Sequence, residues 1–417
     1  MLDLSKEYGL VLEGGGAKGA YQIGVWKALR ECGIRIKAIA GVSVGALNGA
    51  LITMGDYETA ENIWTNIQYS SIMDVKDDQM QSLMHLDLKS LNIRTIGADS
   101  IKFLSDRGFD ITPLKNMIST YIDEDKIRNS PIEFMLGTFS LNDRKEVNLT
   151  DAQMEPGYIK DYLLASAYLP FFKSEELHGK RYLDGGVVNK VPLDMLINRG
   201  YRDIISVRIY GFGVERRIKI PPEVSVYEVA PRVGLGGIMD FDKDRSQLNL
   251  KIGYYDGMRL IRGLKGKVYY IQAEEPEEEY IRLLTEIPEA ARMALIEWAR
   301  LDYTRPELYQ RQMFETVFPE VAAELRLGKD WTYQDLYIAM LELCAKALRI
   351  KKYNIYTIEG LITLIVKKYS ALEKTDGLRF PVFVEVILQV IMLHTRAGIP
   401  EQSSGKIADQ EEDTLFS

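Results

Sequence analysis

The sequence predicts an α/β protein with a mostly parallel central sheet flanked by helices, followed by a helical C-terminal domain. Two observations support this fold class. Short apolar runs alternate with helical patterns in the first part of the chain, which is typical of βαβ units. After an acidic run at residues 274–279, the patterns become almost entirely helical. We therefore expect a first domain over residues 1–273, a helical domain over residues 274–399 and a disordered acidic tail over residues 400–417.

The first domain is predicted to begin with the order strand, helix, strand, helix. We expect these elements over residues 10–13, 20–32, 38–42 and 44–54, with Gly33 ending the first helix. A later helix over residues 161–168 is expected to end at Pro170. The polar segment 57–110 is compatible with helices that cover a site. Further strands are expected over residues 133–139, 146–149, 181–183, 204–208 and 268–273, the last of which closes this domain.

Composition places the chain among ordinary globular proteins. Its 417 residues are 46% apolar and 27% charged, which excludes a largely disordered or fibrous chain. The net charge of -8 and the lack of a strong basic block argue against nucleic-acid binding. The same acidity disfavours attraction to anionic lipid, so any contact with a membrane surface should be transient, local and apolar.

Cysteine usage and the N-terminus indicate a cytoplasmic protein, peripheral at the membrane at most. No secretory signal precedes the first strand, and the two cysteines, Cys32 and Cys344, fit neither a metal site nor a disulfide framework. The longest apolar stretch, residues 382–393, contains Glu385 and Gln389 and is too short and polar to span a bilayer. We interpret it as a core helix in preference to an interfacial one.

A glycine-rich loop follows the first strand, with the sequence Gly14-Gly15-Gly16-Ala17-Lys18-Gly19. It formally matches a dinucleotide fingerprint, but residues 33–47 contain no acidic residue that could hold a ribose. A Walker loop does not fit, because Ala20 and Tyr21 follow the last glycine. Consecutive glycines at a helix N-terminus can instead direct backbone N–H groups at an anion, such as the oxyanion of acyl transfer. Lys18 is expected either beside a phosphate head group or on the surface.

A second motif, Gly41-Val42-Ser43-Val44-Gly45, lies between the second strand and the second helix. This GxSxG pattern is typical of a nucleophile elbow, in which Gly41 and Gly45 leave room for a strained turn. Ser43 would project above the sheet edge at a helix N-terminus, which favours developing negative charge. A tight turn without chemistry is the alternative, and the glycine loop one βα unit earlier argues against it.

The activating base of Ser43 is best sought in Asp184. Only three histidines are present, and a triad has little support: His394 lies in the helical domain, His178 in an expected hairpin turn and His85 in a polar stretch. Asp184 closes a short predicted strand and is followed by two glycines, so other backbone can approach its carboxylate. An aspartate is a weak base at its usual pKa, so proximity and desolvation must compensate.

Together these motifs resemble the patatin-like phospholipase family over roughly residues 8–273. The resemblance rests on the glycine loop, the GxSxG motif, the triplet Asp184-Gly185-Gly186, the run Ala165-Ser166-Ala167-Tyr168-Leu169-Pro170 and residues 187–192. It implies a three-layer α/β fold and a Ser-Asp dyad of Ser43 and Asp184. It also implies an oxyanion hole from the backbone of Gly15 and Gly16, and no metal or organic cofactor. The family often has Arg in place of Lys18, so bidentate anion binding at this position is less expected.

By this resemblance Ser43 attacks an ester carbonyl, an acyl-enzyme forms and water releases the fatty acid. The expected activity is that of a phospholipase A, lysophospholipase or carboxylic ester hydrolase, with a lipid or acyl ester as its substrate. Three alternatives stay open: a lipid-binding or regulatory protein with little turnover, a transacylase using the same dyad, and a dinucleotide-dependent oxidoreductase. The intact Ser43, Asp184 and glycine loop argue against the first, and the missing acidic residue against the last.

Overall fold

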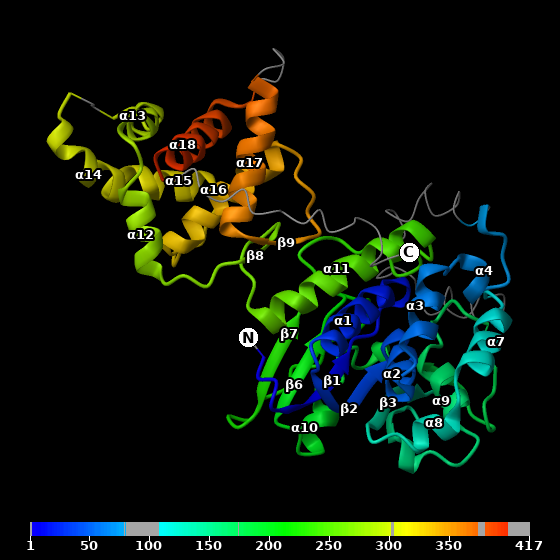
Figure 1. Cartoon of the computed structure of the whole chain (residues 1–417). Coiled ribbons are helices and arrows are strands. Elements are labelled where there is room, and N and C mark those ends of the chain that lie inside the picture. Colours follow the sequence, from blue (N-terminus) through cyan, green and yellow to red (C-terminus); the bar gives the residue numbers. More distant parts are fainter. Residues whose placement is uncertain are drawn as a thin grey trace. The chain divides into compact units, whose positions relative to one another are not determined.

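The computed structural model describes residues 2–78, 80, 108–173, 175–301, 304–373 and 380–398. The chain divides into two compact units, Met1–Arg262 and Gly263–Ser417 (Figure 1). Three earlier expectations lie outside the described residues: the acidic tail, His85 and the part of segment 57–110 between residues 81 and 107.

The first unit is built on a seven-stranded, mostly parallel sheet with the order β4-β3-β2-β1-β6-β7 and with β5 paired to β3. Strand β1 runs parallel to β2 and β6, and β3 and β7 extend this parallel set on either side. Only β4 and β5 pair antiparallel, both with β3. The strands are β1 Glu7–Leu12, β2 Arg35–Val42, β3 Glu133–Ser140, β4 Lys145–Thr150, β5 Tyr182–Asp184, β6 Asp203–Val207 and β7 Ser225–Val229.

Helices cover both faces of this sheet, so the predicted fold class is confirmed. On one face, a cluster of buried side chains joins strands β1, β2, β3 and β6 to α10 (Leu193–Asn198). On the other face, Gly49 of α2 (Val44–Met54) lies against Leu12, Ile39 and Phe134. The other α-helices in the described part of the unit are α1 Ala20–Glu31, α3 Tyr57–Thr65, α4 Tyr69–Ile72, α7 Thr112–Tyr121, α8 Glu124–Arg128, α9 Ile159–Ser166 and α11 Lys243–Arg262.

Helix α11, which the sequence pattern did not reveal, packs closely along α1 (Figure 1). A side chain at Gly24 would lie 2.0 Å from the backbone oxygen of Leu250, and one at Gly253 would lie 2.0 Å from that of Tyr21. The two helices therefore approach so closely that only glycine fits at these crossing points. The buried face of α11 also contains Ser246 and Asn249, which weakens its apolar periodicity.

The second unit is mainly helical, as predicted, and has its own buried core. Residues 387, 388 and 390–392 of the last helix are buried in this core, which confirms the expected core helix. No helix in the described part of the chain is long and apolar enough to cross a membrane. The main helices are α12 Glu277–Thr285, α13 Glu289–Trp298, α14 Tyr309–Gln312, α15 Phe318–Glu324, α16 Tyr333–Ala347, α17 Ile358–Glu373 and α18 Val382–Gly398.

The expected boundary at residue 273 differs from the observed division between Arg262 and Gly263. The run 268–273 does form a strand, β8 (Tyr270–Gln272), but β8 pairs with β9 (Ile355–Thr357) and not with the large sheet. Its assignment as the last strand of the first domain was therefore wrong. A short apolar run predicts a strand but does not specify its partner strand, because pairing depends on distant residues.

Candidate active site

The glycine loop lies at the carboxyl end of β1, where parallel strands present a crevice. The Gly14 N–H donates to the backbone oxygen of Lys190 at 3.0 Å. The N–H groups of Gly15 and Gly16 have no hydrogen-bond partner within the described residues. Gly16 has a φ of 58°, and a side chain there would lie 2.1 Å from the Ile238 backbone oxygen. The loop thus requires glycine and leaves two backbone donors unpaired.

Lys18 and Gly19, the other predicted loop residues, have packing roles. The Lys18 ammonium donates to the backbone oxygen of Tyr210 at 2.8 Å. Burial lowers the pKa of Lys18, while the nearby Glu13 carboxylate acts in the opposite direction. A side chain at Gly19 would lie 2.4 Å from Val44, so this glycine allows the loop to pack on α2.

Ser43 lies on a strained turn between β2 and α2, with a φ of 56° and a ψ of -129°. Side chains at Gly41 and Gly45 would lie 2.2 Å from the backbone oxygens of Gly45 and Leu12, respectively, so both positions require glycine. The Ser43 N–H donates to the Ser166 hydroxyl at 2.8 Å. This geometry is that of a nucleophile elbow.

Asp184 is the last residue of β5 and is 4% exposed. Its Oδ1 accepts a hydrogen bond from the Gly186 N–H at 2.7 Å, whereas its buried Oδ2 has no hydrogen-bond partner among the described residues. Burial raises the pKa of Asp184 to about 6, although the Ser43 side chain and the Gly186 N–H favour the ionised form. Gly185 packs on β3, where a side chain would lie 2.4 Å from the Gly137 oxygen.

One small cavity brings the three predicted motifs together. The residues that line it are Gly14, Gly15, Gly16, Ser43, Leu169, Asp184, Phe212 and Ile238. Ser43 and Asp184 therefore face the same space, next to the unpaired N–H groups of the glycine loop. A carbonyl group in this cavity would lie near a hydroxyl, a carboxylate and two backbone N–H groups.

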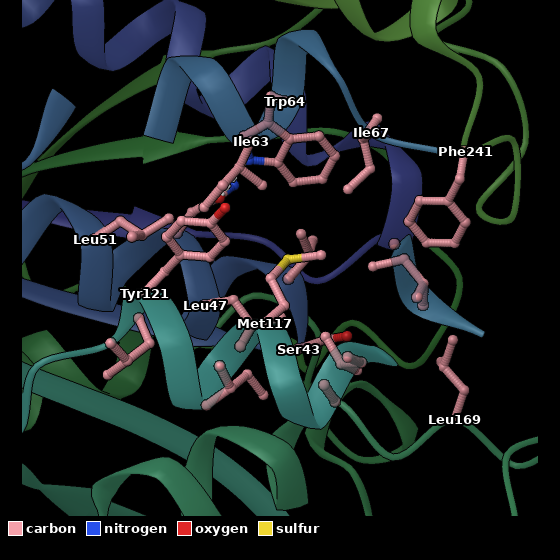
Figure 2. A pocket seen from close by; sticks show the side chains of 18 of the residues that line it. Ser43, Leu47, Leu51, Ile63, Trp64, Ile67, Met117, Tyr121, Leu169 and Phe241 are labelled. Carbon is pink, nitrogen blue, oxygen red and sulfur yellow. Dashed lines mark hydrogen bonds between the residues drawn. The ribbon is translucent and has the colours of Figure 1, made fainter. Parts of the chain in front are cut away.

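A larger and almost wholly apolar pocket also includes Ser43 (Figure 2). Val44, Leu47, Asn48 and Leu51 form one face of α2 and line this pocket at helical spacing. Figure 2 shows Trp64 and Ile67 on one side and Met117 across from them. The empty space measures about 710 Å³ and includes open solvent, so the pocket opens to the surface. An apolar chain attached to a carbonyl at Ser43 can occupy this pocket.

Glu13 is a site residue that sequence reasoning missed. Its fully buried carboxylate accepts hydrogen bonds from the N–H groups of Ile209, Tyr210 and Gly211 at 2.7, 3.0 and 3.2 Å. It also pairs with Lys190 and Arg208, each at 3.1 Å. The sequence did contain a signal for this residue. Glu13 is acidic, although it directly follows an apolar strand and precedes the glycine loop, and a charged residue at such a buried position is expected to be paired.

Ser166 belongs to the run 165–170 that resembles the family, but the sequence did not predict its contact with the turn at Ser43. Its hydroxyl is fully buried, accepts from the Ser43 N–H and donates to the Gly137 oxygen at 2.7 Å. The residue thus connects the nucleophile turn to β3. Its motif indicated a family resemblance, but the contact itself depends on folding.

His178 does not line the described cavity. His178 lies in a turn, as expected, where its ring stacks on Tyr158 at 3.7 Å and its Nε2 lies 2.6 Å from Asp161. His394 belongs to α18 of the second unit, and its side chain is outside the described residues. No group of three or more His, Cys, Asp or Glu residues in the described part of the chain is arranged to hold a metal ion.

Sequence comparisons identify relatives that match about half of the chain. The chain is 30% identical over 202 residues to neuropathy target esterase sws from Drosophila melanogaster. It is 24% identical over 200 residues to patatin-like phospholipase domain-containing protein 7 from Mus musculus. It is also 27% identical over 208 residues to lysophospholipase NTE1 from Cryptococcus neoformans. These segments cover 48–49% of this chain but only 11–13% of the relatives.

Two solved structures align along most of the chain at low similarity. VipD from Legionella pneumophila aligns with 93% of this chain and 91% of its own, at a TM-score of 0.35 and 13% identity. The type III effector protein ExoU aligns with 92% of this chain and 77% of its own, at a TM-score of 0.31 and 14% identity.

The family model for patatin-like phospholipases matches residues 10–197. This range contains the glycine loop, the turn at Ser43 and the triplet that begins at Asp184. The match confirms the resemblance inferred from the motifs. The chain therefore carries a domain of the patatin-like phospholipase family.

Proposed function

We propose that this chain is a serine acyl hydrolase that cleaves fatty-acyl esters of lipids, including phospholipids. Ser43 acts as the nucleophile and Asp184 as the general base. One observation carries the proposal: the two side chains line one small cavity, and the buried Oδ2 of Asp184 lacks a hydrogen-bond partner among the described residues. The family match and the lysophospholipase named among the relatives support the same chemistry.

In the first half-reaction, the Ser43 hydroxyl attacks the ester carbonyl carbon and its proton passes to Asp184. The carbonyl oxygen becomes an oxyanion, which the N–H groups of Gly15 and Gly16 stabilise. The Gly14 N–H does not contribute, because it is already bonded to Lys190. Collapse of the intermediate breaks the ester bond, and protonated Asp184 returns its proton to the leaving alcohol. An acyl-Ser43 ester remains.

In the second half-reaction, Asp184 removes a proton from water as the water oxygen attacks the acyl carbonyl. The second oxyanion uses the same backbone donors. Its collapse breaks the bond to Ser43 and returns the proton to the serine oxygen, which releases the fatty acid. An acceptor alcohol in place of water would make the reaction a transacylation, with the same groups.

The apolar pocket supports a fatty acyl chain as the acyl part of the substrate. Its α2 wall begins at Ser43 and continues to Leu51, a distance of roughly 12 Å along the helix. Burial of methylene groups there would contribute about 0.8 kcal/mol each. The chain would lie along α2 while the ester carbonyl occupies the small cavity.

Covalent labelling and ester hydrolysis test the proposal together. The purified full chain is treated with a fluorophosphonate probe and assayed with p-nitrophenyl esters, alongside Ser43→Ala, Asp184→Asn and His394→Ala. We expect labelling at Ser43, no labelling in Ser43→Ala, and at least about a thousandfold lower kcat in Asp184→Asn. His394→Ala should keep its activity.

Asp161→Asn is the matched control, because it makes the same chemical change at an exposed carboxylate that binds His178. It should retain wild-type activity. Loss of activity in His394→Ala would indicate that the enzyme uses a triad that includes His394 and not a Ser-Asp dyad. A folded wild-type chain that neither labels nor hydrolyses any ester would overturn the enzyme and favour a lipid-binding protein.

A further inference from the structure

The loop that follows β6 holds three apolar side chains in solvent beside the small cavity. Tyr210, Phe212 and Val214 are 52%, 53% and 52% exposed. They alternate with Ile209, which is buried, and with two glycines. We call Tyr210, Phe212 and Val214 the apolar strip. Exposing several large apolar side chains in one short segment costs solvation free energy and commonly marks a contact surface.

The backbone of this loop is fixed to both catalytic motifs. A side chain at Gly211 would lie 1.8 Å from the Gly14 oxygen, and one at Gly213 would lie 2.2 Å from the Gly186 oxygen. The Val214 N–H also donates to the Gly186 oxygen at 2.9 Å. The inward positions must therefore be glycine, because the loop rests directly on the two motifs.

Buried polar contacts hold the rest of the loop. Glu13 accepts the N–H groups of Ile209, Tyr210 and Gly211, as described above. The Lys190 N–H donates to the Val214 oxygen at 2.8 Å. With its backbone bonded at both ends, the loop cannot easily withdraw its apolar side chains from water.

The strip is continuous with the candidate active site. Phe212 lines the small cavity together with Ser43 and Asp184. A partner that covers the strip would therefore meet the cavity at Phe212. For a hydrolase of lipid esters, a partner that supplies substrate at this position is the surface of a lipid aggregate.

The charges around the strip favour a zwitterionic surface over an anionic one. Arg208 is paired with Glu13, Glu215 and Glu228, each within 3.1 Å. Arg216 is paired with Glu146 and Asp194. The exposed cations that come next in the sequence, Arg217 and Lys219, can pair with the phosphate of any phospholipid head group. The net charge of -8 opposes long-range attraction to anionic lipid.

We propose that Tyr210, Phe212 and Val214 insert into the surface of a zwitterionic lipid aggregate and so present its ester groups to the cavity. Tyrosine and phenylalanine suit this position, because aromatic rings favour the boundary between head groups and acyl chains. The lipid as substrate rests on the proposed function, but binding to the surface does not require turnover. The two can therefore be tested separately.

The test uses the full chain with Ser43→Ala, so that vesicles stay intact. Sedimentation with phosphatidylcholine vesicles gives the partition coefficient of this chain and of a version that also carries Tyr210→Ser, Phe212→Ser and Val214→Ser. We expect the triple change to weaken binding at least about tenfold. Leu4→Ser is the matched control and should bind normally. Leu4 is 58% exposed. It precedes the amino end of β1, whereas the site lies at the carboxyl end of this strand.

Circular dichroism and thermal melting must first show that each variant is folded. The proposal is overturned if the folded triple variant binds as well as its parent, or if the parent does not bind phosphatidylcholine vesicles. Salt-sensitive binding to phosphatidylglycerol vesicles alone would also overturn it, in favour of electrostatic attraction. If analytical ultracentrifugation without vesicles shows a lower mass for the triple variant than for its parent, the strip is instead a self-association surface. If the parent binds vesicles but the wild-type chain is not labelled at Ser43 by the fluorophosphonate probe, the docking surface is retained and the hydrolase is rejected.

Discussion

The Ser166 hydroxyl accepts a hydrogen bond from the backbone N–H of Ser43 at 2.8 Å. The same hydroxyl donates to the Gly137 oxygen at 2.7 Å, so it connects the nucleophile turn to β3. Ser43 has a positive φ of 56°, which a non-glycine residue keeps only when its surroundings hold it there. Ser166 is fully buried and provides part of that restraint.

Ser166→Ala should therefore reduce activity more than a simple loss of stability would explain. The change leaves the Ser43 N–H and the Gly137 oxygen buried without this partner, which should lower the free energy of unfolding by about 1–3 kcal/mol. Displacement of the Ser43 hydroxyl should lower kcat by about 10- to 100-fold. Urea unfolding and the kcat for a p-nitrophenyl ester give the two quantities.

Ser130→Ala is the control for this prediction. Ser130 also donates its hydroxyl to a backbone oxygen, that of Thr53 at 2.7 Å, at the other end of α2 from Ser43. The control should lose some stability and keep its kcat. Equal kcat values in the two variants would show that Ser166 does not position the nucleophile.

Glu13→Gln should strongly destabilise the first unit. The buried carboxylate binds three backbone N–H groups and pairs with Lys190 and Arg208, so the change leaves two cations without their buried anion. We expect a loss of about 3–5 kcal/mol in the free energy of unfolding. The loop on the glycine motif should loosen, and kcat should fall. Chemical unfolding with parallel ester kinetics measures both.

Glu228→Gln makes the same change at another partner of Arg208, at the same 3.1 Å distance. The Glu228 side chain is 49% exposed, so its ion pair should contribute only about 0–1 kcal/mol. A similar loss in both variants would contradict the special role of the buried Glu13.

The β1–α1–β2–α2 segment was predictable because its signals are local. The glycines at 16, 41 and 45 each fill a place that admits no side chain, and the apolar spacing between the motifs fits strands and helices. Strand β7 was missed, because only Val229 of its five residues is buried and no alternation results. The partner of β8 was also not predictable, since strand pairing depends on distant residues.

The candidate site was predictable in part. Asp184 was chosen as the partner of Ser43 because suitable histidines are lacking and two glycines follow it, and the family resemblance implied the same pair. Their distance in sequence gives no direct evidence that they lie close together. The roles of Glu13 and Ser166 were missed for a related reason. The partners of Glu13 are Lys190 and residues of the loop after β6, and those of Ser166 lie at Ser43 and in β3. Such polar contacts leave no periodic pattern in the sequence.

Leu51→Trp should shorten the apolar pocket and shift the preferred acyl length. Leu51 lines the pocket on α2, away from Ser43, so a larger side chain should obstruct long chains before short ones (Figure 2). We expect kcat/KM for p-nitrophenyl laurate to fall about tenfold relative to that for p-nitrophenyl butyrate. The butyrate ester serves as the internal control for folding. Equal losses for both esters would place the acyl chain elsewhere.

The pH dependence of hydrolysis should follow Asp184. Burial raises its pKa to about 6, and only the carboxylate can accept the Ser43 proton. The kcat/KM for an uncharged ester should therefore fall about tenfold for each pH unit below about 6, and should level off above it. Profiles of kcat/KM against pH, measured where the chain stays folded, test this. A midpoint near the ordinary aspartate value would contradict the buried base.

The same raised pKa predicts that Asp184 lowers stability at neutral pH. Between the ordinary value of 3.8 and about 6, the folded state holds a proton on Asp184 that the unfolded state has released. The free energy of unfolding contributed by this group therefore falls as pH rises through that window, by about 3 kcal/mol in total. Asp184→Asn removes this titration, so its stability relative to wild type should rise by about that amount between about pH 4 and about pH 8. Urea unfolding at both pH values measures the change. If the difference in free energy of unfolding between Asp184→Asn and wild type is the same at both pH values, Asp184 is ionised in the folded state across this range and its pKa is not raised.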